Sequence, residues 1–303
     1  MKELTQALDR GRFGLRRIRS RLPMISRGVV PIRVVCHLGT TAEISAENEA
    51  EPLSQIEWKS ALVDLVAWLG PVRVCVDCRT DGQIPLAMDL IRLAHRLECA
   101  THLVCMGPVS SDQALELIDR GLGAVTLRVG GLDERTQQLV LNGKLEAVSA
   151  TMSAFSEARA LRERDLFLQV NIAAHDENVE SIGSIAGWAY QAGADAVSLG
   201  LLLGAPVPRG ILDVMERLPD VETPSALVRF LNRDASEIAG ARLSLSASGG
   251  LSASLTQSPF GNVRDESPQS LWAKNKKAVQ EALHHERPFD EVELLPLNLR
   301  CRR

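Results

Sequence analysis

The sequence predicts an α/β protein in which helices cover a parallel β-sheet, and three observations indicate this fold class. From residue 31 onward, six short β-branched runs alternate with longer amphipathic stretches. The runs carry Val, Ile and Leu at successive positions, as parallel strands buried on both faces do. The chain has 303 residues, 45% hydrophobic and 24% charged, which is enough to bury a sizeable core. Six βα units fit either a doubly wound sheet or a partial barrel, and periodicity does not separate the two.

The predicted elements follow in chain order. Each strand run is short and rich in β-branched residues. The six strands are Ile32–Cys36, Val72–Asp77, His102–Met106, Ala124–Val129, Leu166–Ile172 and Ala196–Leu201. The helical stretches between them are Gln55–Leu69, Ile84–Leu97, Ser111–Arg120, Glu134–Glu163 and Val179–Ala192. Ser110 has the chemistry of an N-cap for the third helix, and Gly121 and Gly193 predict two helix ends.

The pattern changes after Gly204. A Pro- and Gly-containing loop comes first, and one or two helices, a hairpin signal at Ser248–Gly250 and a final helix follow it. These later elements are Ile211–Leu218, Ser225–Asn232, Arg242–Ser246, Leu251–Leu255 and Leu271–His284. We therefore divide the chain into an N-terminal arm (1–30), a barrel-like domain (31–204) and a C-terminal extension (205–303).

The N-terminal arm is strongly basic. It carries eight Arg and Lys residues against two acidic ones, whereas the whole chain has a formal charge of −4. Such an arm fits an acidic partner or an anionic surface. Nucleic-acid binding is disfavoured, because the arm has no aromatic interleaving and no recognition motif. We find no apolar run long enough for a transmembrane segment and no signal-peptide core, so a cytoplasmic location is expected.

The six cysteines are predicted to be buried free thiols in a reducing compartment. Cys75 and Cys78 form a C-x-x-C, but no second pair stands at zinc spacing. An odd separation along one strand also places these two side chains on opposite faces. We therefore predict no metal site at this pair.

Several segments, in the right order, resemble radical SAM proteins with a SPASM-type C-terminal extension. The resemblance runs over most of residues 31–273 and favours a partial (β/α)6 TIM-like barrel with a small α+β extension. Its pieces are the loop Leu38–Glu49, Leu53–Trp58, Pro85–Ala94, Gly121–Gly130, Val170–Asn178, Gly193–Ser198, Ala239–Ser254 and Gly261–Trp272. The last two look like the SPASM hairpin and its ending.

The departures from the family pattern fall on its cofactor chemistry. The resemblance puts the three cluster-ligand positions at Ala42, Ala46 and Glu49, where the family has cysteines. It puts two further cysteine positions of the extension at Glu237 and Ser254.

The positions that bind S-adenosylmethionine (SAM) in the family depart as well. They correspond to Cys78, Arg79, Thr80 and Asp81, counted from the strand, and to Arg128 on the fourth strand; anchoring on Pro85 instead gives Gly82–Pro85. Iron–sulfur ligation needs thiolates. The resemblance therefore predicts a cluster-less chain with no cofactor, in which SAM binding is doubtful.

The predicted strand ends offer other chemistry at the barrel mouth. His37, Asp77 and His175 are candidate metal ligands with Asp176 as base, although no metal-ligand spacing strengthens that interpretation. Arg79 and Arg128 suit an anionic ligand, or they pair with nearby aspartates. Phosphate-loop, nucleophile-elbow and dinucleotide motifs are missing.

Two functional hypotheses follow from this combination. The first is a pseudoenzyme: a non-catalytic, radical SAM-like protein that binds, scaffolds or regulates, with an active radical SAM enzyme or its peptide substrate as partner. The alternative is an enzyme with repurposed metal- or acid/base-dependent chemistry at the mouth, using the His37, Asp77, His175 and Asp176 set.

Overall fold

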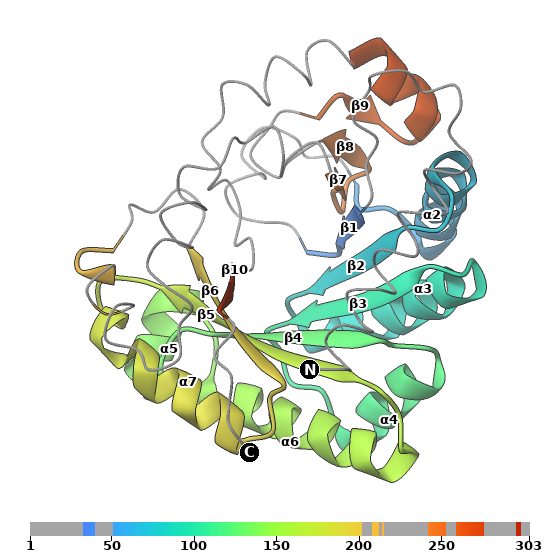
Figure 1. The fold of residues 1–303 in the computed structure, drawn as a ribbon. Coiled ribbons are helices and arrows are strands. Elements are labelled where there is room, and N and C mark those ends of the chain that lie inside the picture. The colour runs from blue at the N-terminus through green and yellow to red at the C-terminus, as the bar shows by residue number, and fades with distance from the viewer. Residues whose placement is uncertain are drawn as a thin grey trace.

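The computed structural model describes residues 33–39, 51–201, 208–211, 214, 242–252, 259–275 and 295–297. Within these residues the chain forms one ten-stranded sheet, in the order β10-β6-β5-β4-β3-β2-β1-β7-β8-β9 (Figure 1). The strands are β1 (Arg33–His37), β2 (Arg73–Cys78), β3 (Ala100–Cys105), β4 (Ala124–Val129), β5 (Phe167–Ala174), β6 (Ala196–Leu201), β7 (Arg242–Leu245), β8 (Gly250–Ser252), β9 (Gly261–Asn262) and β10 (Leu295–Leu297).

The six central strands confirm the predicted fold class. Strands β1 to β6 pair in chain order, and each pair is parallel. The sheet curves like part of a barrel and stays open, because β10 and β9 stand at opposite ends of the strand order (Figure 1). This is the α/β, TIM-barrel-like architecture that alternating strands and helices predict.

The helices cover the outer side of the curved sheet (Figure 1). They are α2 (Gln55–Leu69), α3 (Ile84–Arg96), α4 (Ser111–Asp119), α5 (Glu134–Leu141), α6 (Leu145–Arg162) and α7 (Ile182–Gln191), with short 3-10 turns η1 (Asp81–Gln83) and η2 (Val179–Ser181). Ser54 and Ser110 are the N-caps of α2 and α4, and each forms a capping box. The serine hydroxyl accepts from the backbone N–H of the third helical residue, whose side chain accepts from the backbone N–H of the serine.

The predicted helical interval Glu134–Glu163 is divided into α5 and α6 in the structure. Asn142 ends α5 in the left-handed conformation, with a φ of 51°, and Gly143 follows it. Asparagine tolerates this conformation better than most residues do, so it provides a local stop. Side-chain periodicity alone does not reveal such a stop.

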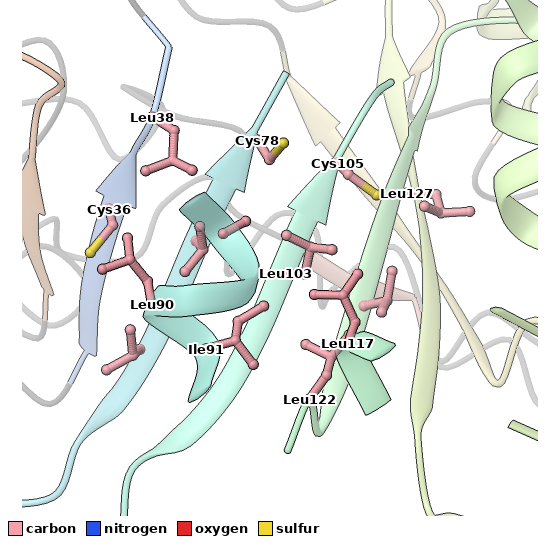
Figure 2. Close-up of a cluster of buried hydrophobic side chains, with 14 of the residues drawn as sticks. Cys36, Leu38, Cys78, Leu90, Ile91, Leu103, Cys105, Leu117, Leu122 and Leu127 are labelled. Atoms are coloured by element: carbon pink, nitrogen blue, oxygen red, sulfur yellow. The ribbon is translucent and has the colours of Figure 1, made fainter. Parts of the chain in front are cut away.

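The main hydrophobic core lies between the sheet and its helices. Side chains at alternate strand positions point into this core, among them the fully buried Cys36, Val76 and Leu103. Figure 2 shows the thiols of Cys36, Cys78 and Cys105 in the buried layer that also contains Leu103, Leu127 and leucines of α3 and α4, so these thiols take the place of small apolar side chains.

The C-terminal strands extend both edges of the central sheet. Strand β7 pairs parallel with β1, β8 and β9 continue antiparallel, and β10 pairs antiparallel with β6. Trp272 packs against Trp68 of α2, with ring centroids 6.1 Å apart. The described parts of the predicted extension are thus built into the sheet and core, while the boundaries at residues 30 and 204 stay predictions.

Arg264 ties the segment after β9 to the start of α2. Its guanidinium donates to Glu57 Oε1 at 2.6 Å and to the carbonyl oxygens of Glu51 and Pro52 at 2.8 and 3.0 Å. The hydrogen bond from Arg264 lowers the pKa of Glu57 to about 2. Arg264 therefore fixes residues 51–57, which follow residues 40–50; the latter lie outside the described residues.

No helix in the described part of the chain has both the length and the apolar character needed to cross a membrane. The predicted basic arm, residues 1–30, lies outside the described residues.

Candidate functional site

The candidate site lies on the inner face of the curved sheet, opposite the helices. Because side chains alternate along a strand, the neighbours of the core positions point inward. Register aligns His37 of β1 with Asp77 of β2, and Arg128 of β4 with Asn171 of β5. The inner face is therefore polar where the strands end, whereas the outer face at these ends carries apolar side chains such as Leu38 and Cys78.

Asp77 is the centre of a charged cluster at this end of the sheet. Its side chain is 2% exposed, and Oδ2 lies 3.1 Å from His37 Nδ1 in a hydrogen bond. The same oxygen lies 3.8 Å from the guanidinium of Arg128 and 4.0 Å from Nε of Arg79. We call Asp77, His37, Arg79 and Arg128 the Asp77 cluster. It brings together four residues that the sequence had placed at separate strand ends.

The electrostatics of the cluster keep Asp77 ionised. Burial by itself would raise the pKa of this carboxyl, but Arg128, the hydrogen bond from His37 and Arg79 together lower it below its ordinary value. The charge is not fully matched by hydrogen bonds. Within the described residues Asp77 Oδ1 has no hydrogen-bond partner, and neither arginine side chain donates one.

The turn after β2 fixes the position of Arg79. Gln83 Oε1 accepts from the backbone N–H of Arg79 at 2.8 Å and lies 3.3 Å from that of Thr80. Asp81 accepts from the N–H of Gly82 at 2.8 Å, so its carboxylate serves the turn itself. Cys78 faces the core and donates to the Thr80 carbonyl at 3.2 Å. Of the four turn positions singled out by the resemblance, only Arg79 contributes a charge to the cluster.

A second polar group lies on β5 and β6. Asn171 is fully buried and donates from Nδ2 to Ser198 Oγ at 3.1 Å, while its Oδ1 has no partner among the described residues. Asn178 donates to the carbonyl oxygens of Gly130 and Ala173 at 2.6 and 2.7 Å. The buried Asn178 thus joins the ends of β4 and β5 and has a structural role.

His175 and Asp176 serve the loop after β5. Asn178 accepts from the N–H of His175, and the ring of His175 accepts from the N–H of Glu177 at 3.2 Å. Asp176 accepts from the N–H of Arg209 at 2.8 Å. No set of three or more His, Cys, Asp or Glu side chains in the described part of the chain is placed to hold a metal ion. The structure therefore brings His37 and Asp77 together but does not complete the metal set with His175.

The described cysteines do not form a sulfur-ligand set either. Cys75 packs with Val35 and Val104 on the inner face, whereas Cys78 lies in the main core, so the two thiols point to opposite sides. Burial raises the pKa of Cys36 and of Cys78 to about 12, and it also raises that of Cys105. In the folded chain these three buried thiols are therefore protonated at neutral pH.

The positions that the resemblance assigns to cluster ligands lie outside the described residues: Ala42, Ala46, Glu49, Glu237 and Ser254. Alanine has no donor atom, so Ala42 and Ala46 do not fit a cluster-ligating role.

Comparison with known proteins identifies the fold. No family model matches the chain. PqqA peptide cyclase of Gluconobacter oxydans is 26% identical over 157 residues, which cover 52% of this chain and 42% of that protein, so the chain spans less than half of its length.

Solved structures extend the likeness over most of the chain. Streptococcus suis SuiB bound to its precursor peptide SuiA has a TM-score of 0.63 at 10% identity, covering 90% of this chain and 71% of SuiB. SuiB bound to SAM has a TM-score of 0.62 at 11% identity, with coverage of 86% and 67%. Native anSMEcpe with bound SAM has a TM-score of 0.57 at 10% identity and covers 84% of each chain. The chain therefore has a radical SAM-like fold.

These structures correct one prediction. The sequence led us to expect a chain with no cofactor, no [4Fe–4S] cluster and doubtful SAM binding. SuiB and anSMEcpe share the fold and were each solved with SAM bound, which contradicts that expectation. The expectation rested on ligand positions that the resemblance assigns to residues 42, 46 and 49, and these lie outside the described residues.

Proposed function

We propose that this chain is a peptide-binding protein of the radical SAM-like fold, a pseudoenzyme that contributes binding and not radical chemistry of its own. Binding of SAM is compatible with this proposal. The observation that carries it is the Asp77 cluster, in which a buried carboxylate fixes two partly exposed guanidinium donors at the end of the sheet where α/β barrels bind their ligands.

The chemistry of the cluster supports a peptide as the ligand. A peptide offers carbonyl oxygens to the guanidinium groups of Arg79 and Arg128, whose side chains are partly exposed, whereas the buried Asp77 carboxylate holds these two arginines in position. The mutual contacts of the cluster hold these groups in place before a ligand arrives, which reduces the entropy cost of binding. Relatives point the same way, since SuiB was solved with the peptide SuiA and the Gluconobacter protein is named for a peptide.

The pseudoenzyme part of the proposal is supported by the donor set. Radical chemistry on this fold needs three thiolates around one iron–sulfur cluster. The positions assigned to them carry two methyl groups and a carboxylate, at Ala42, Ala46 and Glu49. The enzymatic alternative has no comparable support, because the ring of His175 accepts from Glu177 in its own loop and the Asp176 carboxylate accepts from the backbone N–H of Arg209.

Two measurements on the full chain test this function. The first is anaerobic reconstitution with iron and sulfide, followed by SAM and a reductant, with detection of 5′-deoxyadenosine. We expect none above the level without protein, and stoichiometric formation would overturn the pseudoenzyme proposal.

The second measurement is binding to an array of random twelve-residue peptides. We expect a reproducible bound set that the Arg128→Met variant loses and the exposed α5 variant Arg135→Met retains. An array without bound peptides, or a bound set indifferent to Arg128→Met, would contradict the assignment of binding to the cluster.

A further inference from the structure

We propose that Arg33 and Arg73, at the opposite end of the inner face from the Asp77 cluster, form a second anchor that binds acidic side chains of the peptide. This inference rests on the proposed function and specifies the kind of peptide.

Backbone register places the two arginines next to each other. Arg33 begins β1 and Arg73 begins β2, and the two are register partners in the parallel pair. Their neighbours Val34 and Val74 lie in the main core, so Arg33 and Arg73 belong to the inner face. On the other side of β1, Arg242 of β7 is the register partner of Arg33. Three adjacent strands therefore begin with arginine in one row, about 4.8 Å apart from strand to strand.

Among the described residues, the positive charges of Arg33 and Arg73 have no ion-pair partner. Desolvation, and next the charge of Arg33, lower the pKa of Arg73. Like charges directly opposite each other in a sheet are destabilising. The sheet thus carries a repulsion that an anionic ligand would relieve.

The next inward-facing row, two residues further along the strands, carries no charge. His102 is 8% exposed, and its Nε2 lies 2.8 Å from Thr126 Oγ1. Burial first, and then the two arginines, lower the pKa of His102 to about 3, so the ring carries no charge at neutral pH. Ser244 of β7, in the same row as Val35, is 1% exposed and its hydroxyl has no hydrogen-bond partner among the described residues.

The geometry of the guanidinium groups favours a carboxylate as the ligand. Each guanidinium presents a planar fork of N–H donors that matches a carboxylate in a bidentate pair. Arg73 is exposed and Arg33 half-buried, so a ligand can reach them from solvent. A peptide segment that carries Glu or Asp and approaches this end of the sheet from solvent would pair with both residues. The inner face then has a mixed polar anchor at one end and a purely cationic anchor at the other.

The test uses the full chain and two fluorescein-labelled twelve-residue probes of alternating Ser and Glu, or alternating Ser and Gln, with binding followed by fluorescence anisotropy. We expect the Glu probe to bind at least tenfold more tightly than the Gln probe at low salt, because charge-assisted bonds are lost with Gln. Arg73→Gln and Arg33→Gln should each weaken the Glu probe by about tenfold and leave the Gln probe unchanged. The matched control is Arg96→Gln, which removes an exposed arginine from α3 on the outer side.

The outcomes separate this inference from the proposed function. Equal affinity for both probes, or a Glu preference that Arg73→Gln leaves intact, would refute the acidic anchor while peptide binding on the array stands. No binding of the Glu probe together with Arg73-dependent binding of inorganic phosphate would also refute it, by showing a phosphate site. Failure of the peptide array, by contrast, would remove the proposed function itself.

Discussion

Replacement of Asp77 by asparagine removes the one charge that holds the Asp77 cluster together, and we expect it to destabilise the protein. Asn keeps the size of the side chain but leaves Arg128 and Arg79 without a counter-charge, at distances of 3.8 and 4.0 Å. A pair of unit charges at such distances attracts by about 4 kcal/mol at an effective dielectric constant of 20. Desolvation of the carboxylate and the partial exposure of both arginines offset much of this gain, so we expect a net loss of about 2–4 kcal/mol.

The pH dependence of that loss provides a sharper test. The folded-state pKa of Asp77 lies below its ordinary value of 3.8, so the carboxylate stabilises the fold fully above that value. The stabilisation is lost as the pH falls through the ordinary value towards the folded-state pKa. The difference in unfolding free energy between wild type and Asp77→Asn should thus be constant from pH 8 to about pH 5 and shrink below about pH 4.

Urea unfolding followed by circular dichroism from pH 3 to pH 8 measures this difference. Asp119→Asn is the matched control, because Asp119 is an exposed carboxylate that also pairs with an arginine, Arg162. We expect only a small effect for the control, as for other exposed ion pairs. An Asp77→Asn variant as stable as wild type at pH 7, or a difference that grows on acidification, would show that the cluster does not stabilise the fold as described.

The remaining predictions concern two glycines next to or within helices and two cysteines of the main core. Gly121→Ala should lower the free energy of unfolding by more than about 2 kcal/mol, since Gly121 has a φ of +98° and an added Cβ would lie 2.2 Å from Cγ of His95. Gly187→Ala in α7 is the control, because an added Cβ meets nothing within 4 Å there, and it should be neutral or stabilising. Thermal unfolding of both variants measures the difference. The thiols of Cys36 and Cys78, with pKa values of about 12, should resist a disulfide reagent at pH 8 in the native protein and react fully in urea. Rapid native labelling of either thiol, identified by mass spectrometry, would contradict their described burial.

Much of the fold was predictable because the strands are marked locally. Runs such as Val34–Cys36 and Leu103–Cys105 are apolar at successive positions, which is typical of strands covered on both faces. The cap at Ser110 was also predictable, since its hydrogen bonds reach only three residues along the chain. The short strands β9 and β10 were not, because two or three residues carry no periodicity and are strands only through their partners.

The sequence predicted which residues belong to the candidate site, but it did not predict which of their side chains are in contact. His37, Asp77, Arg79 and Arg128 stood out as polar residues at predicted strand ends. That Asp77 contacts the other three depends on the order and register of the strands, and Arg128 reaches it across β3. The same reasoning wrongly grouped His175 with them, because its loop hydrogen bonds are invisible in sequence. The arginine row was missed, since its signal is a register between strands far apart in the chain.

The sequence by itself determined the α/β class and the succession of six central strands along the chain, since these depend on residue type and short-range pattern. Only the tertiary structure decided which charges meet. The joining of β10 to β6, the contact of Arg264 with Glu57 and the Asp77 cluster all link residues that are distant along the chain. The physical reason is that ion pairs and strand pairing depend on distances of a few ångströms, which are set when the whole core packs and not by local preference.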